Sequence, residues 1–300
     1  MAYTDRGTTR RGSGPRGILR REMPGTVGLL ADARDFAQMV RYRTFGFDDH
    51  AVYLRHVEAL LRTLGSRGTH TSVALFDPAR FADFCARTGL EPDSPASRSR
   101  FTADIAARGA TIAYAGQPLD SLITQLVDET ARQATWEYTT TVLAGLGDCA
   151  DCGKDVGRAA FDRAARLVHL LLETAGPGTH HLVCSVPAAS DQLLAVLHAE
   201  CEPHGPVRVD DAEAAEFATV LATGIALESP GGLVLRTSAP GAPDRLRGWR
   251  LSRGRLAPLT TAEVFSAYCT DAETGDPVAP EPGVEYCAGF EVDDPGGHDH

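Results

Sequence analysis

The chain has 300 residues, 43% of them apolar, and a formal net charge of −11, so it is long enough to bury one large core or two modest ones. No apolar run reaches the roughly 18 residues that cross a bilayer, and no signal-peptide pattern follows the N-terminal arginines, so we expect a cytoplasmic protein that does not act in a membrane. The seven cysteines are too scattered for a disulfide framework, and the acidic charge disfavours general nucleic-acid binding.

Charge is distributed unevenly between the two ends. Residues 1–22 hold six arginines against two acidic side chains, and residues 271–300 hold nine acidic side chains and no lysine or arginine. The first segment lacks a periodic apolar pattern and the second is rich in proline, so we expect a disordered basic tail and an acidic, largely disordered C-terminal tail. Translation from Met23 would remove the basic tail. With 28 arginines and one lysine, the composition is typical of a GC-rich genome, which weakens inferences drawn from any single arginine.

Helices and strands are predicted to alternate along the first half. The clearest element is residues 77–89, where Asp77 suits a helix N-cap, Pro78 the first turn and Gly89 the C-terminus. The apolar periodicity predicts, in order, a strand at 26–32, a helix at 48–65, a strand at 69–77, the helix at 77–89, a helix at 99–108, a strand at 110–116 and a helix from Asp120 to about Leu143.

The second half is predicted to begin at a cysteine-containing turn and to continue the alternation. Its pattern predicts a helix at 155–174, a strand at 180–187, helices at 190–200 and 211–227, a strand at 231–238, a hairpin at 244–259 and a helix at 260–269. The hairpin turns at Ser-Arg-Gly-Arg, and a threonine suits the N-cap of the last helix.

The two halves agree in several places when they are aligned at an offset of 110 residues. Residues 68–70 and 178–180 both read Gly-Thr-His, and similar elements follow in the same order. We therefore predict an α/β fold of two related helix-strand-helix-helix-strand lobes, at 23–147 and 148–270, with a β-hairpin and a helix ending the second. Chance recurrence of leucine and glycine in a biased composition is the competing explanation.

Cys149 and Cys152 form the segment with the clearest chemical pattern. Two cysteines separated by two residues and followed by a glycine suit a zinc knuckle, because the glycine lets backbone amides approach the sulfurs. Helices flank the pair, so the strand that precedes a thioredoxin-like redox motif is missing. A closed tetrahedral site needs two more ligands, which the cluster at 198–204 offers. The predicted zinc ligands are Cys149, Cys152, Cys201 and His204. The alternative is two ordinary thiols ahead of a helix.

Polar side chains at the expected ends of strands form a second candidate site. In open α/β sheets a ligand binds beyond the carboxyl ends of the strands, and the helix N-termini there suit an anion. The candidate ligand-binding residues are Asp77, Ser185 and Ser190, although Asp77 is already explained as a helix cap. The segment 45–50 with His56 offers carboxylates and imidazoles for acid–base or metal chemistry, or a capped helix start.

The predicted hairpin interleaves arginines with a tryptophan. Arg247, Trp249 and Arg250 can bind phosphate or stack on a base, so they are candidate ligand-binding residues as well. No RNA- or DNA-binding module accompanies them. An internal partnership between these arginines and the acidic tail is an equally good explanation of the pattern.

The motifs that are absent also bear on function. The chain has no phosphate loop, Gly-x-Gly-x-x-Gly turn, nucleophile elbow or His-Glu-x-x-His sequence, which disfavours the commonest nucleotide-dependent and hydrolytic enzymes. We expect a cytosolic binding or regulatory protein with a structural zinc, whose partner is a small molecule or a protein. The alternative is an enzyme that acts on a small anionic or nucleotide-like substrate at the strand ends or at a Cys/His metal site.

Overall fold

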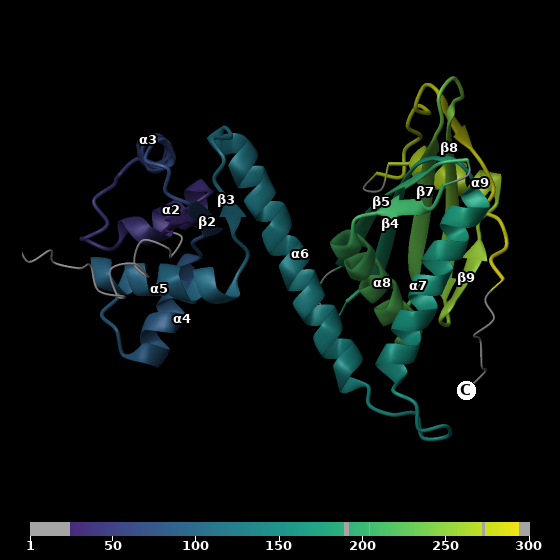
Figure 1. The fold of residues 1–300 in the computed structure, drawn as a ribbon, viewed down its shortest axis with the longest axis horizontal. Coiled ribbons are helices and arrows are strands. Elements are labelled where there is room, and N and C mark those ends of the chain that lie inside the picture. The colour runs from purple at the N-terminus through teal and green to yellow at the C-terminus, as the bar shows by residue number, and fades with distance from the viewer. Residues whose placement is uncertain (1–24, 189–191, 204, 272–273, 294–300) are drawn as a thin grey trace, which may run out of the picture. The chain divides into compact units, whose positions relative to one another are not determined.

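A computed structural model describes residues 25–188, 192–203, 205–271 and 274–293 (Figure 1). The described part contains eight helices and ten strands, which confirms the predicted α/β class. The chain divides into two compact units, the first ending at Gln133 and the second beginning at Ala134. This boundary falls within helix α6 (Leu119–Gly145), whereas the sequence pattern predicted a joint at the cysteine-containing turn. The predicted basic tail and the alternative start at Met23 lie outside the described residues.

The first unit is built on a three-stranded sheet in the order β1 (Gly25–Leu29), β2 (Thr71–Leu75) and β3 (Ile112–Ala113). β1 and β2 are parallel, and β3 is antiparallel to β2. The unit's helices are α2 (Ala33–Val40), α3 (His50–Ser66), α4 (Pro78–Thr88), α5 (Pro95–Arg108) and the first part of α6. Their apolar faces enclose a core rich in aromatic rings, in which Phe76 contacts both Phe81 and Phe101 at centroid distances of 5.3 and 5.0 Å.

Local sequence accounts for the ends of α4 as predicted. The Asp77 carboxylate accepts hydrogen bonds from the backbone N–H groups of Ala79 and Arg80, at 2.7 and 3.1 Å. Pro78 occupies the first turn, where its missing N–H costs nothing. Gly89 ends the helix with a φ of 68°, a conformation that favours glycine. The helix boundaries therefore follow from three residues that are close in sequence.

The second unit is built on a larger sheet, with strands in the order β10-β8-β7-β4-β5-β6 and with β9 also paired to β8. The strands are β4 (Gly178–Pro187), β5 (Gln192–Cys201), β6 (Val207–Val209), β7 (Gly231–Ser238), β8 (Asp244–Ser252), β9 (Arg255–Pro258) and β10 (Val284–Tyr286). All neighbours are antiparallel except β10 and β8. Helices α7 (Val156–Ala175) and α8 (Asp211–Ala226) pack on the sheet, and α9 (Thr261–Tyr268) contacts β8 (Figure 1).

β4 shows how this sheet separates buried from exposed side chains. His180, Leu182, Cys184 and Val186 are at most 1% exposed, whereas the residues between them are half-buried or exposed. The alternation follows from the two-residue period of a strand. The buried set packs with α7 and α8 in one core. In α8 every residue from Glu216 to Ile225 is buried.

Residues 192–201 form strand β5, so the helix predicted at 190–200 is wrong for its described part. The leucines and valine of this segment fit a helical face as well as a strand. Pairing with β4 continues along all ten residues of β5, and it buries Leu193, Ala195 and Leu197 on the helix-covered face. The apolar pattern of this segment fits a helix or a strand, and pairing with β4 makes it a strand.

The predicted internal duplication is not confirmed. The sheet of the first unit has three strands and a parallel pair, whereas the sheet of the second unit is mostly antiparallel. Thr69 precedes β2, while Thr179 lies inside β4 and pairs with Glu200 on one side and Ser238 on the other. The two Gly-Thr-His sequences therefore lead into strands with different surroundings.

Part of the predicted disordered acidic tail is ordered on the second sheet. β10 pairs with β8, and the Cys287 N–H donates to the Leu246 carbonyl oxygen at 2.8 Å. The Phe290 ring lies 5.0 Å from that of Trp249. The predicted hairpin and the final helix, which Thr260 caps, are confirmed as β8, β9 and α9. Among the described residues no helix is both long and apolar enough to cross a membrane.

Candidate functional site

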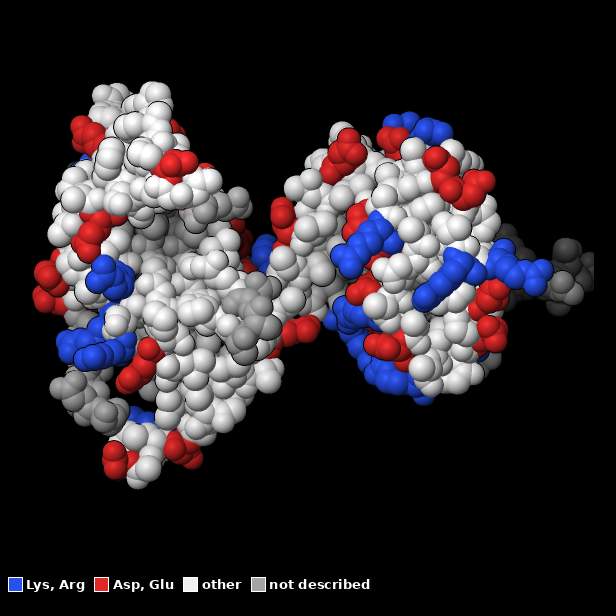
Figure 2. Space-filling model, turned by 180° about the vertical axis from the view of Figure 1, so that it is seen from behind, with Lys and Arg blue, Asp and Glu red and all other residues white. Residues whose placement is uncertain are grey.

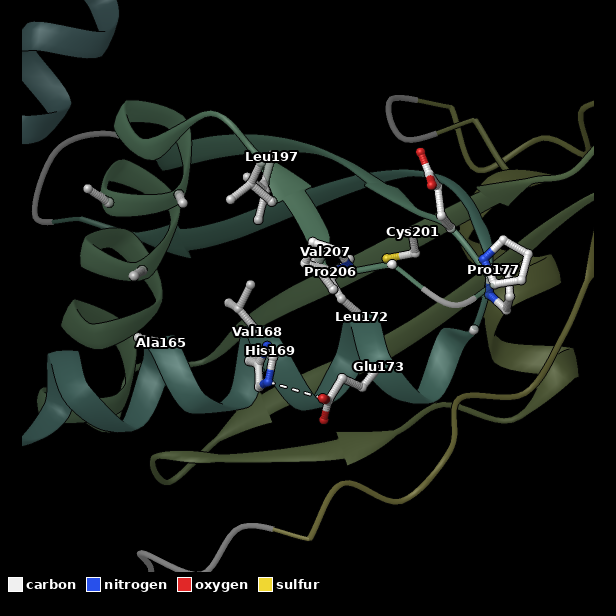
Figure 3. Close-up of a pocket in the computed structure, with 18 of the residues that line it drawn as sticks. Ala165, Val168, His169, Leu172, Glu173, Pro177, Leu197, Cys201, Pro206 and Val207 are labelled. Carbon is white, nitrogen blue, oxygen red and sulfur yellow. Dashed lines mark ion pairs between the residues drawn. The ribbon is translucent and has the colours of Figure 1, made fainter.

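A cavity of about 840 Å³ opens at one edge of the second unit's core (Figure 3). α7 forms one wall, α8 another, and β5, β6 and the loop between them complete the lining. The volume lies within the roughly 300–1,000 Å³ of small-molecule sites. Most of the lining side chains are aliphatic, so the cavity suits a ligand with an apolar surface.

Small side chains on α8 keep this cavity open. Ala214, Ala215 and Ala218 line it from α8, where longer side chains would extend toward α7. On α7, Val168 and Leu172 line the opposite wall and are 7% and 2% exposed. The cavity therefore exists because the alanines of α8 are too short to fill the space beside the well-packed side chains of α7.

Few polar groups line the cavity. His169 and Glu173, one turn apart on α7, form an ion pair with 3.2 Å between Nε2 and Oε1, and Figure 3 shows this pair beside the apolar wall. Burial raises the pKa of the Cys201 thiol, which keeps it protonated at neutral pH. The Glu202 carboxylate also lines the cavity and pairs with Arg208 at 3.0 Å.

The charge of the lining restricts the ligand. Among the described residues that line the cavity there are two glutamates and a histidine but no lysine or arginine. An anionic group taken into the cavity would lie near the carboxylates of Glu173 and Glu202, and the guanidinium of Arg208 beside Glu202 is already paired. A neutral or positively charged polar end fits this lining better.

The loop that joins α6 to α7 carries Cys149 and Cys152 and lies within the second unit. It follows the last residue of α6, Gly145, and turns at Gly147, whose φ of 69° favours glycine. Asp148 and Asp155 then pair as an antiparallel bridge. The Asp155 carboxylate caps α7, accepting the Arg158 N–H at 2.6 Å. Both ends of the loop are thus fixed by hydrogen bonds.

The tip of this loop is a closed turn. The Cys149 N–H donates to the Lys154 carbonyl oxygen, and the Gly153 N–H donates to the Cys149 carbonyl oxygen, each at 2.8 Å. The N–H groups of Cys152 and Asp151 and the Cys152 thiol donate to the Cys149 sulfur and lower the pKa of Cys149. Cys152 is exposed and Cys149 is half-buried. The turn therefore carries two accessible thiols, and the lowered pKa of Cys149 favours its thiolate form.

The predicted four-residue zinc site is not brought together by the fold. Cys149 and Cys152 precede the first residue of α7, whereas Cys201 pairs with Gly178, just beyond the last residue of that helix. A helix of 20 residues is about 30 Å long. His204 lies outside the described residues. In the described part of the chain no three histidine, cysteine or acidic side chains form a group that could hold a metal.

Each described strand-end candidate has a hydrogen-bonded partner within its own unit. Asp77 is used as the cap of α4. The Ser185 hydroxyl, on β4, accepts a hydrogen bond from the Gln192 side chain across the β4–β5 pair. Asp77 and Ser185 belong to different units, and Ser190 lies outside the described residues.

The hairpin residues have partners within the second unit. Arg250 pairs with Glu263 at 3.0 Å. Trp249 is 1% exposed and donates from Nε1 to the Phe290 carbonyl oxygen at 2.9 Å. The Arg247 guanidinium lies 5.9 Å from the Phe290 ring centroid. Figure 2 shows acidic and basic side chains intermixed over the face in view. Trp249 and Arg247 thus contact Phe290 of the C-terminal segment, whereas the partner of Arg250 lies in α9. Pairing of these arginines with acidic side chains of the tail stays a prediction.

The acidic and histidine-containing segment at 45–50 is a helix start. Asp49 caps α3 by accepting the Val52 N–H at 2.7 Å. The ring of His50 bonds to the Leu30 carbonyl oxygen at 3.1 Å, and the ring of His56 bonds to the Val52 carbonyl oxygen at 2.8 Å. Both imidazoles thus bond to backbone carbonyls rather than converge on one point.

Two features escaped the sequence analysis. One is the cavity, whose only sequence signal is the run of alanines in 212–218. The other is a stacked pair, His181 and His198, with ring centroids 4.9 Å apart and Glu213 3.1 Å from His198. Desolvation, with smaller contributions from His198 and Arg236, lowers the pKa of His181. The pair exists because β4 and β5 are in register, which no local pattern indicates.

Comparison with known proteins covers part of the first unit. Residues 14–117 are similar to a family described as a domain of unknown function (DUF8829). This match spans about a third of the chain and leaves out the cavity and the cysteine turn. No curated protein and no solved structure matches the chain.

Proposed function

We propose that the chain is a cytoplasmic binding protein whose second unit takes up a small ligand with an apolar body and a neutral or positively charged polar end. The observation that carries the proposal is the cavity between α7, α8 and the β5–β6 edge. Its size, its aliphatic lining and the lack of lysine or arginine among the described lining residues all support this ligand class. The seven cysteines, all free, suit a reducing compartment.

A binding role is favoured over catalysis by the chemistry of the lining. Burial raises the pKa of Cys201, which opposes its use as a thiolate nucleophile. His169 is engaged by Glu173 on an exposed part of α7. These groups can orient a ligand, but no activated nucleophile is formed among them.

Fluorescent probes test the proposal directly. N-phenyl-1-naphthylamine, which is apolar and uncharged, is expected to bind the full-length protein at one saturable site. The anionic probe 8-anilinonaphthalene-1-sulfonate is expected to bind more weakly by about tenfold or more, a difference of about 1.4 kcal/mol. Ala215→Phe fills the cavity and should weaken binding of the neutral probe by a similar factor.

The matched control is Ala212→Phe, which adds the same ring to an exposed position of α8 outside the cavity. It should leave affinity for the neutral probe unchanged. Equal affinity of the two variants, or preference of the wild-type protein for the anionic probe, would contradict the proposal.

A further inference from the structure

We propose that two copies of the chain share one zinc ion, each copy donating the sulfurs of Cys149 and Cys152. This site is separate from the cavity and does not depend on the proposed ligand. It follows from the geometry of the turn, from the coordination that zinc requires and from where the remaining cysteines lie.

The backbone of the turn has a defined shape. Its backbone is closed by the hydrogen bonds between Cys149 and both Lys154 and Gly153. Cys149 and Cys152 lie three residues apart in this closed turn, the first half-buried and the second exposed, so both sulfurs are available to one ion.

The base of the turn is held firmly. α6 and α7 approach so closely there that a Cβ at Gly157 would overlap the Leu143 carbonyl oxygen. Figure 1 shows the loop extending beyond the adjacent ends of the two helices, away from the sheet. The sulfurs are therefore carried at a tip that a second molecule can reach.

One chain provides only half of the ligands. A structural zinc site is tetrahedral and takes four nitrogen or sulfur ligands. In the part of the chain that the structure describes, no third metal-binding side chain joins the pair. Within the second unit Cys184 and Cys269 are 1% and 5% exposed, Cys201 is at the far end of α7, and Cys287 is bonded through its N–H to β8. A second copy related by a twofold axis supplies the missing two sulfurs with the same geometry.

Charge makes the contact dependent on the metal. The exposed tip carries Asp148 and Asp151 beside Lys154, and the bound sulfurs add further negative charge. Two such tips repel each other unless a cation lies between them, and salt screens that repulsion. As each sulfur bonds to zinc, its thiol releases a proton to water. We therefore expect the dimer to require zinc and to become tighter, not weaker, as ionic strength rises.

The test uses the full-length protein under reducing conditions, stripped of metal and then titrated with zinc chloride. Light scattering coupled to size exclusion should show a monomer that becomes a dimer, with bound metal reaching one zinc per two chains. A chelator should restore the monomer. Cobalt in place of zinc should give the absorption of a tetrahedral four-thiolate site.

Variants separate the turn from other surfaces. The double variant Cys149→Ser and Cys152→Ser should bind no zinc above background and remain monomeric. Cys287→Ser, which removes a half-buried cysteine elsewhere in the second unit, should behave as wild type. Cys152→His retains a ligand and should keep the metal-dependent dimer. Circular dichroism checks that each variant is folded.

Three results would overturn the proposal. One is a monomer that binds one zinc per chain, which places all ligands within one molecule. Another is a dimer that survives both the chelator and the double serine variant. The third is wild-type protein that binds no more zinc than the double variant. None of these outcomes bears on probe binding in the cavity.

Discussion

Three cysteines show how local environment sets thiol chemistry in this chain. Hydrogen bonds from the N–H groups of Cys152 and Asp151 lower the pKa of Cys149. Burial raises the pKa of Cys184 to about 12, and it also raises the pKa of Cys201 in the cavity wall. Because the thiolate is the reactive form, side chains of one type differ in reactivity by position alone.

This difference predicts the order of alkylation. In metal-free, reduced protein at neutral pH, iodoacetamide should modify Cys149 at least about tenfold faster than Cys201, because the lower pKa of Cys149 gives it more thiolate. Cys184 should react only after unfolding, since it is 1% exposed. Peptide mass spectrometry over time measures each rate. Faster modification of Cys201 than of Cys149 would contradict the described environments.

At the scale of elements, the crossing of α6 and α7 depends on one glycine. Gly157 lies against the Leu143 carbonyl oxygen, so the two helices meet where there is no side chain. Gly145, at the end of α6, has no atom within 4 Å of a Cβ built on it. Helix propensity treats the two glycines alike, whereas packing separates them.

Alanine substitutions measure this contrast. Gly157→Ala should destabilise the second unit by about 1–3 kcal/mol, because the added methyl forces the helices apart. Gly145→Ala, the matched control, should be neutral or stabilise by up to about 1 kcal/mol. Urea denaturation followed by tryptophan fluorescence gives both values. Stabilisation by Gly157→Ala would show that α6 and α7 do not meet as described.

At the scale of the whole molecule, two separate cores have formed. The core of the first unit is enclosed by α2 to α6, and the core of the second lies between the larger sheet and α7 and α8. Both tryptophans, Trp136 and Trp249, belong to the second unit. Tryptophan fluorescence therefore reports on the second unit alone, whereas circular dichroism reports on both.

Substitutions that truncate a core side chain should therefore affect tryptophan fluorescence and circular dichroism differently. Leu171→Ala removes a fully buried side chain of the second unit. It should lower the free energy of unfolding, measured by tryptophan fluorescence in urea, by about 2–5 kcal/mol. Leu61→Ala removes a buried side chain of the first unit. It should move to lower urea only the part of the circular dichroism change that comes from the first unit, and it should leave the fluorescence transition in place. If both variants shift the fluorescence transition equally, the units unfold as one cooperative body.

Residues close together in sequence determined much of this protein. Asp77, Pro78 and Gly89 delimit α4, Thr260 caps α9, and the hairpin of β8 and β9 turns at its expected residues. The Cys149 turn is likewise a local structure. These elements could be predicted because caps and turns are closed by hydrogen bonds between neighbours in the chain.

Tertiary structure alone decided the rest. Residues 192–201 became a strand because β4 offers ten partners, and β10 formed because β8 has a free edge. The cavity arose where the alanines of α8 face α7. The separation of Cys201 from Cys149 reflects the length of α7 between them. Each outcome depends on contacts between segments distant in sequence, which local propensity and periodicity do not contain.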